Sequence, residues 1–208
     1  MLMSINRTEI NWEHIGHANY VVAMAAMDGA LYAITQDYKL WIRVAVPGDI
    51  NWQVIGQANQ AVAMAAANNM LFAATQDGSF WVREGVAEDI KWDKIGQAEK
   101  VIAMTASDGN LYAVTSDNKL LTREVNTEDI PWVEIGHANN VVGLTATGGK
   151  LYAATSDNNL WMRDTVHEDL IWQQIGHANN VVAMAASEGK LFAATSDNRL
   201  WIRPSEAS

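Results

Sequence analysis

Short apolar runs separated by turn residues make up almost the whole chain. In its last part, VVAMAA (181–186), KLFAAT (190–195) and LWIR (200–203) are separated by SEG and SDN, and IWQQIG (171–176) precedes them. Turn signals recur roughly every 8–12 residues, which leaves no room for a helix of useful length. The pattern therefore predicts short β-strands joined by tight turns.

Several of these turns carry the residue pairs that two-residue β-hairpins favour. Both central residues of such a turn take a positive φ, which Gly, Asn and Asp tolerate best. We therefore expect neighbouring strands to pair antiparallel. The pairs are Asp28-Gly29, Asp77-Gly78, Asp108-Gly109, Asp117-Asn118 and Gly148-Gly149.

The strand pattern repeats five times with a period of forty residues. The copies span 11–50, 51–90, 91–130, 131–170 and 171–208, and no linker or change of composition separates them. Several positions hold the same residue type in all five copies. In the first copy they include Trp12, Gly16, Thr35, Asp37 and Arg43. Fixed-period repeats of this length indicate a repeat architecture, and we predict one domain over residues 1–208.

Four short antiparallel strands in each forty residues describe a propeller blade, and five copies predict an all-β, five-bladed β-propeller. A trefoil would need three copies, and a parallel solenoid would not show paired hairpin turns. The chain starts with a spare outer strand, NWEHIG (11–16), and its last copy lacks one. We expect this N-terminal strand to close the ring by completing the last blade, which removes an open sheet edge.

Two polar motifs should share one face of the ring. The loop from each outer strand to the next inner strand, here called the inward loop, reads HANN at residues 137–140 and 177–180. The turn between the second and third strands, the middle turn, reads SDN at 156–158 and 196–198. Alternating strand directions place both at one end. The Glu-Asp pairs of the connection from the third to the outer strand, the outer connection, are expected on the opposite face.

Charge and composition narrow the range of partners. The 208 residues carry a formal net charge of −10 and no cysteine, with an isoelectric point of about 4.8. An acidic surface disfavours nucleic acid and anionic membranes, and the absence of cysteine excludes disulfides and thiolate metal sites. No signal peptide or membrane span is visible. We expect a cytoplasmic monomer without cofactor, with export lacking a signal peptide as the alternative location.

Several recurrent residues have a structural interpretation. Trp12 and the equivalent tryptophans should pack along blade edges. Arg43 and the equivalent arginines should bridge a carboxylate or a loop carbonyl. Asp37 and its equivalents favour turns. Equivalent histidines on successive blades lie too far apart to share a metal ion, so no metal site is expected.

The inward loops, the middle turns and the third-strand tryptophans remain as candidates for ligand binding. The third copy differs, with Gln97, Glu99 and Lys100 in its loop and Leu121 in place of Trp. The candidate ligand-binding residues are His17, Asn19, Asp37, Trp41, Asn59, His137, Asn139, Asn140, Asp157, Trp161, His177, Asn179, Asn180, Asp197 and Trp201.

Catalysis has little support in the sequence. No nucleophile elbow, zinc-protease helix motif or phosphate loop is present. Chemistry requires one asymmetric constellation, whereas this chain repeats its polar groups, which suits repeated binding. We therefore expect a protein that is not an enzyme.

The repeat W..IG…..VAMAA..GKLYAAT.DN.LW.R, over residues 11–203, resembles the tachylectin-type five-bladed propeller lectins and, more loosely, tectonin repeats. The resemblance implies several equivalent sites for N-acetylated sugars or surface glycans. One motif differs: those blades carry Gly-Gly-Trp after Ile-Gly, and this chain has His17-Ala18-Asn19 there. Two hypotheses follow. One is a multivalent lectin. The other is a protein-interaction or purely structural ring, natural or engineered, without a small ligand.

Overall fold

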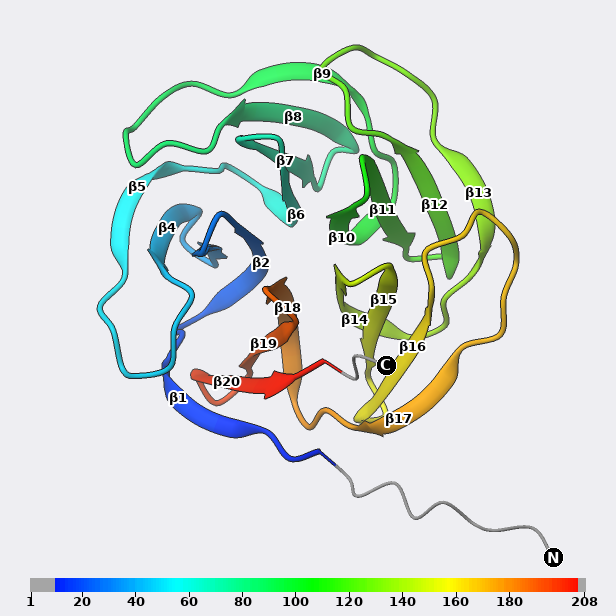
Figure 1. The fold of residues 1–208 in the computed structure, drawn as a ribbon. Helices are drawn as coiled ribbons and strands as arrows, with labels where there is room; N and C mark the ends of the chain where they lie inside the picture. Colours follow the sequence, from blue (N-terminus) through cyan, green and yellow to red (C-terminus); the bar gives the residue numbers. More distant parts are fainter. Residues whose placement is uncertain (1–9, 206–208) are drawn as a thin grey trace, which may run out of the picture.

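The structure, a computed structural model, describes residues 10–205 as a ring of five four-stranded sheets (Figure 1). It confirms the all-β, five-bladed propeller with four antiparallel strands in each blade. The predicted domain ends, residues 1–9 and 206–208, lie outside the described residues. No helix among residues 10–205 is long and apolar enough to cross a membrane.

Each blade is ordered from the axis to the rim of the ring. The inner strands are β2 (Val21–Met27), β6 (Ala61–Ala67), β10 (Val101–Ser107), β14 (Val141–Thr147) and β18 (Val181–Ser187). The second strands are β3 (Ala30–Thr35), β7 (Met70–Thr75), β11 (Asn110–Thr115), β15 (Lys150–Thr155) and β19 (Lys190–Thr195). The third strands are β4 (Lys39–Val44), β8 (Ser79–Glu84), β12 (Lys119–Glu124), β16 (Asn159–Asp164) and β20 (Arg199–Pro204). The outer strands are β5 (Gln53–Gln57), β9 (Asp93–Gln97), β13 (Val133–His137), β17 (Gln173–His177) and β1 (Glu13–His17).

The N-terminal strand closes the ring, as predicted. β1 pairs antiparallel with β20, with Glu13 opposite Ile202 and His17 opposite Arg199. The fifth blade is therefore built from both ends of the chain, and Figure 1 shows β1 running along β20. The pairing satisfies the edge of β20, which would otherwise be open.

The hairpin turns follow the predicted chemistry. Asp28 and Gly29 have φ values of 51° and 73° between β2 and β3. In the middle turns, Asn118, Asn158 and Asn198 take φ values of 65–67°. Both kinds of turn use residues that tolerate the left-handed conformation.

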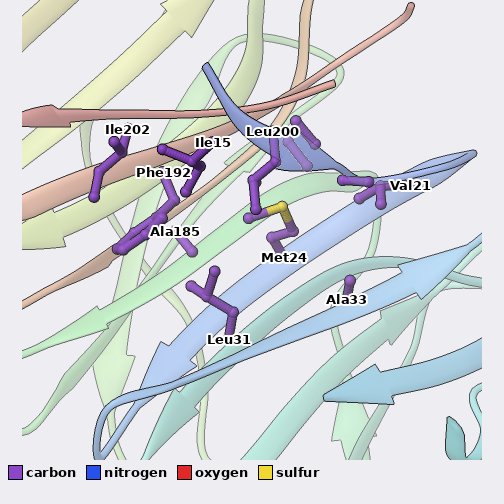
Figure 2. Close-up of a cluster of buried hydrophobic side chains, with 12 residues drawn as sticks. Ile15, Val21, Met24, Leu31, Ala33, Ala185, Phe192, Leu200 and Ile202 are labelled. Atoms are coloured by element: carbon purple, nitrogen blue, oxygen red, sulfur yellow. The ribbon is translucent and has the colours of Figure 1, made fainter. Parts of the chain in front are cut away.

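Five apolar cores lie between adjacent blades rather than inside one central core. In the core between the fifth and first blades, Ile15, Met24 and Leu31 pack with Phe192 and Leu200. Figure 2 shows side chains of β1, β2 and β3 meeting those of β19 and β20. Each blade is buried on both faces, which explains why its strands read as nearly continuous apolar runs.

Small residues on the inner strands make room for methionines of the next blade. Met24 packs in the same core as Ala183, and Met64 packs with Ala23. At Gly143 an added Cβ would lie 2.9 Å from Cγ of Met184, so this contact is tight. The inner strands line two cavities of about 20 Å³ each along the axis. A cavity this small holds about one water molecule.

Candidate ligand sites between the blades

The outer-strand tryptophans and the buried arginines hold the outer connections in place. Trp52 Nε1 donates a hydrogen bond to the His17 carbonyl at 2.9 Å, and the Arg43 guanidinium lies 5.7 Å from the centre of the Trp52 ring. Arg43 Nη2 donates to the carbonyls of Val46 and Gly48 at 2.9 and 3.0 Å. Burial lowers the pKa of Arg43, and Asp49 partly offsets this. The loop-carbonyl interpretation of Arg43 is confirmed.

The same arrangement of tryptophan and carbonyl joins every pair of neighbouring blades. Each of these tryptophans donates to the last residue of the preceding outer strand, at 2.7–3.1 Å. An arginine guanidinium lies within 5.6–5.8 Å of each ring centre. The prediction that these tryptophans pack along the blade edges is therefore confirmed. The donors are Trp12, Trp52, Trp92, Trp132 and Trp172.

The expected position of the outer-connection aspartates was wrong. Each outer connection reaches back across the outer strand of the preceding blade (Figure 1) and ends beside the inward loop. Asp49 Oδ2 lies 3.4 Å from His17 Nδ1, and Asp169 Oδ2 lies 3.8 Å from His137 Nδ1. These carboxylates therefore belong to the same region as the HANN motif and not to the opposite face.

The glycine of the Ile-Gly motif makes this close approach possible. Gly16 has a φ of 144°, and a Cβ added to it would lie 2.7 Å from Oδ1 of Asp49. A Cβ added to Gly56 would likewise lie 2.6 Å from Oδ1 of Asp89. Only glycine fits this backbone conformation and this contact.

A short hydrogen-bond chain fixes the third-strand tryptophan. Trp41 Nε1 donates to Thr35 Oγ1 at 2.9 Å, and Thr35 Oγ1 donates to Asp37 Oδ1 at 2.6 Å. Hydrogen bonds from Lys39 and Thr35 lower the pKa of Asp37 to about 2. The indole N–H is committed to the fold, so a ligand can use only the face of the ring.

The same chain of hydrogen bonds recurs in the second, fourth and fifth copies, where Trp81, Trp161 and Trp201 are the donors. In the third copy Leu121 replaces the tryptophan, and Thr115 Oγ1 accepts instead from the backbone N–H of Lys119 at 3.1 Å. Lys100 Nζ also reaches Asp117 Oδ2, at 3.2 Å. Ion pairs of the middle-turn aspartate also occur in the first copy, with Lys39, and in the fifth, with Arg199, so the third copy differs chiefly in lacking the aromatic face.

Three pockets lie at equivalent positions between blades. The copy-one pocket has a volume of about 840 Å³ and takes its lining from the inward loop, the middle turn, Trp41 and the segment 49–52. The copy-five pocket measures about 560 Å³ and includes Trp201 together with Ile10, Asn11 and Trp12 of the N-terminal segment. The copy-four pocket measures about 190 Å³ and lies beside Trp161 and Trp172.

The structure brings most of the predicted site residues together in these pockets, although His137 and Asn59 are not among their lining residues. Asn140 and Asn180 have φ values of 57° and 56°, and their N–H groups donate to the side chains of Asn118 and Asn158. Their backbones therefore shape the inward loop. The predicted residues that line a pocket are His17, Asn19, Asp37 and Trp41; Asn139, Asn140, Asp157 and Trp161; and His177, Asn179, Asn180, Asp197 and Trp201.

Sequence reasoning missed several lining residues. They are Tyr20, Gln36, Asp49, Asn51 and the outer-strand tryptophans. The recurrence of Asp at 49, 89, 129 and 169 and of Trp three residues later was a visible signal. Its interpretation required the path of the outer connection. Within residues 10–205, no three His, Cys, Asp or Glu side chains lie close enough together to hold a metal ion.

Comparison with known proteins identifies the fold but no family. No protein-family model and no curated protein matches the chain. Among solved structures, glutaminyl cyclase from Myxococcus xanthus is similar with a TM-score of 0.66 and 12% identity, over 94% of each chain. A chain of a nidogen/laminin complex is similar with a TM-score of 0.63 and 12% identity, over 85% of this chain and 72% of that one. At this identity the similarity concerns the propeller fold alone.

Proposed function

We propose that this propeller is a multivalent carbohydrate-binding protein that holds neutral, N-acetylated glycans in the pockets between its blades. One observation carries the proposal: three equivalent pockets each combine a half-buried third-strand tryptophan with the asparagines of an inward loop and the aspartate of a middle turn. The resemblance of the repeats to tachylectin-type lectins supports the same function.

The chemistry of these pockets suits a sugar. A pyranose ring has an apolar face that can lie on an indole, while its hydroxyl and acetamido groups need donors and acceptors at the edge. In the copy-one pocket the side chains of Asn19 and Asn51 make no hydrogen bond within residues 10–205, so their amides remain available to a ligand. Carboxylates around the pockets, such as Asp37 and Asp49, disfavour acidic sugars.

The aspartates favour binding over hydrolysis. A glycosidase needs one carboxyl group with a raised pKa to protonate the leaving oxygen. Here hydrogen bonds from threonine, and from Lys39 in the first copy, lower the pKa of the middle-turn aspartates. They stay ionised near neutral pH and serve as acceptors only.

Multivalency gives weak sites a useful affinity for a decorated surface. Several sites on one rigid ring can raise the avidity by roughly 10²–10⁴ over that of a single site. A glycan array identifies the ligands, and agglutination of glycan-coated beads reports multivalent binding.

The decisive variant replaces three tryptophans by the residue that the third copy carries. Trp41→Leu, Trp161→Leu and Trp201→Leu together should abolish bead agglutination, because each pocket loses its aromatic face. Leu121 occupies the same position, so the variant should keep the β-sheet circular dichroism spectrum of the parent. A folded variant that agglutinates as well as the parent would refute the proposal.

The second candidate is a protein-interaction or purely structural ring. The Trp–Thr–Asp chain favours it, because these polar groups already bond to one another and stabilise the fold without a ligand. A parent protein that binds nothing on the array but captures a protein through its inward loops would support this alternative.

A further inference from the structure

The copy-one pocket is far larger than the copy-four pocket, although the two share their central groups. Both contain the asparagine of the inward loop, the threonine and aspartate before the third strand, and the third-strand tryptophan. Their volumes are nevertheless about 840 and 190 Å³. The copy-five pocket has the same inward loop and middle turn as the copy-four pocket but measures about 560 Å³, so part of the extra volume comes from the residues at position 51 and its equivalents.

The two pockets differ in several of their lining residues. The copy-one pocket is walled by Tyr20 and by Asp49, Ile50 and Asn51, in addition to Trp52. In the fourth copy the equivalents of Tyr20 and Asn51 are Asn140 and Ile171. The Ile171 side chain is 95% exposed and offers no hydrogen bond. The copy-one pocket therefore has an additional wall with aromatic and polar groups.

Tyr20 adopts a left-handed conformation, with a φ of 55°. The equivalent residues of the other copies, Gln60, Lys100, Asn140 and Asn180, take φ values of 56–61°. The backbone N–H of Tyr20 donates to Asn198 Oδ1 at 2.8 Å, but its side chain is 63% exposed. A bulky residue in the left-handed region costs free energy, and burial does not compensate for it here.

Tyr38 provides the internal comparison. It also has a positive φ, of 63°, where other copies carry glycine or asparagine, and it is 36% exposed. Tyr38 is not among the residues that line the copy-one pocket. The argument for Tyr20 therefore rests on its position in the pocket wall and not on its backbone conformation alone.

The polar groups of the extra wall can still bind a ligand. His17 Nδ1 faces Asp49 Oδ2, which leaves Nε2 of the imidazole and Oδ1 of the carboxylate without a hydrogen-bond partner among the described residues. The Asn51 amide is also unpaired within that part of the chain. These groups offer donors and acceptors beyond those beside Trp41.

We propose that the copy-one pocket is an extended site that binds at least two linked sugar units, whereas the copy-four pocket accommodates one. The proposal rests on the carbohydrate-binding function above. The first unit lies beside Trp41 and Asn19. The second lies beside Tyr20, where His17 and Asn51 bond its hydroxyl groups. Tyr20 is thus the residue that determines preference for a longer glycan.

Two matched tyrosine variants test the extended site by isothermal titration calorimetry. The ligands are N-acetylglucosamine and its β1,4-linked dimer and trimer. In the parent, one site per chain should bind the dimer about tenfold more tightly than the monomer, as expected for one added aromatic contact. Tyr20→Asn should remove this gain, so that the dimer and the monomer bind with about the same affinity. Tyr38→Asn should keep the gain.

Both variants introduce a residue that other copies carry at the same position, and asparagine tolerates the backbone conformation, so each should fold. If the parent binds these sugars without any gain from monomer to dimer, the extended site is refuted while the proposed function stands. An unchanged gain in Tyr20→Asn also refutes it. If the parent binds none of the sugars on a full glycan array, both proposals fail together.

Discussion

At the scale of single residues, the recurrence of Thr35, Asp37 and Trp41 was visible in the sequence, but their joint role was not. Thr35 and Asp37 are two positions apart in the sequence, and Asp37 and Trp41 are four. They meet because the turn after β3 reverses the chain and brings β4 back beside its end. Recurrence therefore predicted importance, and only the register of the hairpin showed the hydrogen-bond chain.

The hydrogen bonds from threonine to the middle-turn aspartates predict how the stability of the protein changes at acid pH. The folded-state pKa of the middle-turn aspartates is lowered, to about 2 in Asp37. A lowered pKa stabilises the fold at pH values above the unfolded-state pKa of about 3.9, and this stability is lost as the pH falls. The melting temperature should therefore stay level down to about pH 4 and fall between pH 4 and pH 2. Circular dichroism melts across this range measure it.

An internal comparison locates the cause of the acid effect. The largest contribution to the low pKa of Asp157 is its hydrogen bond from Thr155, and Asp197 has the same relation to Thr195. In a Thr155→Val variant, NMR titration should show the pKa of Asp157 rising toward its ordinary value while that of Asp197 stays low. Equal values for both aspartates would contradict the assignment.

At the scale of elements, the strands were predictable and the outer connections were not. Apolar runs and paired turn residues carry a direct signal for strands and hairpins, and the ring closure followed from one spare strand. The outer connections have no periodic signal. Their path depends on contacts with the preceding blade, such as Asp49 against Gly16, so the aspartates were assigned to the wrong face.

The glycine contact gives a prediction for two matched variants. Gly56 has a φ of 141° and no space for a Cβ beside Asp89, whereas Gly109 has a φ of 76° and no neighbouring atom within 4 Å. Gly109→Ala should cost about 1 kcal/mol for the backbone alone, and Gly56→Ala about 3 kcal/mol or more because the outer connection must also move. Urea unfolding measures both, and equal costs would show that the contact is unimportant.

At the scale of the whole molecule, the five copies should not bind equally. Three carry a described pocket with a third-strand tryptophan, and the third copy has Leu121 in place of that tryptophan. Calorimetry with N-acetylglucosamine should give about three strong sites per chain. The second and third copies should bind more weakly, because Gln57, and Gln97 with Glu99, replace residues of the HANN motif. Five identical sites would contradict this difference.

A gain-of-function variant tests the same difference from the opposite direction. Leu121→Trp with Lys100→Asn gives the third copy the residues that the fourth copy has at 161 and 140. The titration should then show one additional site. An unchanged stoichiometry would mean that Glu99, or the outer connection beside the third copy, also blocks binding.

Ring closure and ligand binding should depend on each other, because the N-terminal segment contributes to the copy-one and copy-five pockets. Ile10, Asn11 and Trp12 line the copy-five pocket, and His17 lines the copy-one pocket. Trp12 Nε1 also donates to the His177 carbonyl at 2.8 Å across the closure. A glycan in the copy-one pocket would therefore contact His17 of β1, and one in the copy-five pocket would contact the segment just before β1.

The first consequence concerns stability. Deleting residues 1–17 removes β1, leaves the edge of β20 unpaired and uncovers Leu200 and Ile202. The loss of several kcal/mol should lower the melting temperature by more than about 10 °C in a chain of this size. Deleting residues 206–208 serves as the control and should change little. A deletion variant that melts like the parent would contradict closure by β1.

The second consequence is that ligand should slow the opening of the ring. A ligand at 100 times its Kd stabilises the state that binds it by about 2.7 kcal/mol, and only the closed ring has complete copy-one and copy-five pockets. Amide hydrogen exchange in β1 and β20 should therefore slow strongly with saturating glycan. β10 and β11, at the far side of the ring, should change less if they open locally. Equal protection of all strands would mean that the ligand stabilises the molecule only against global unfolding, and no protection of β1 would mean that the glycan does not bridge the closure.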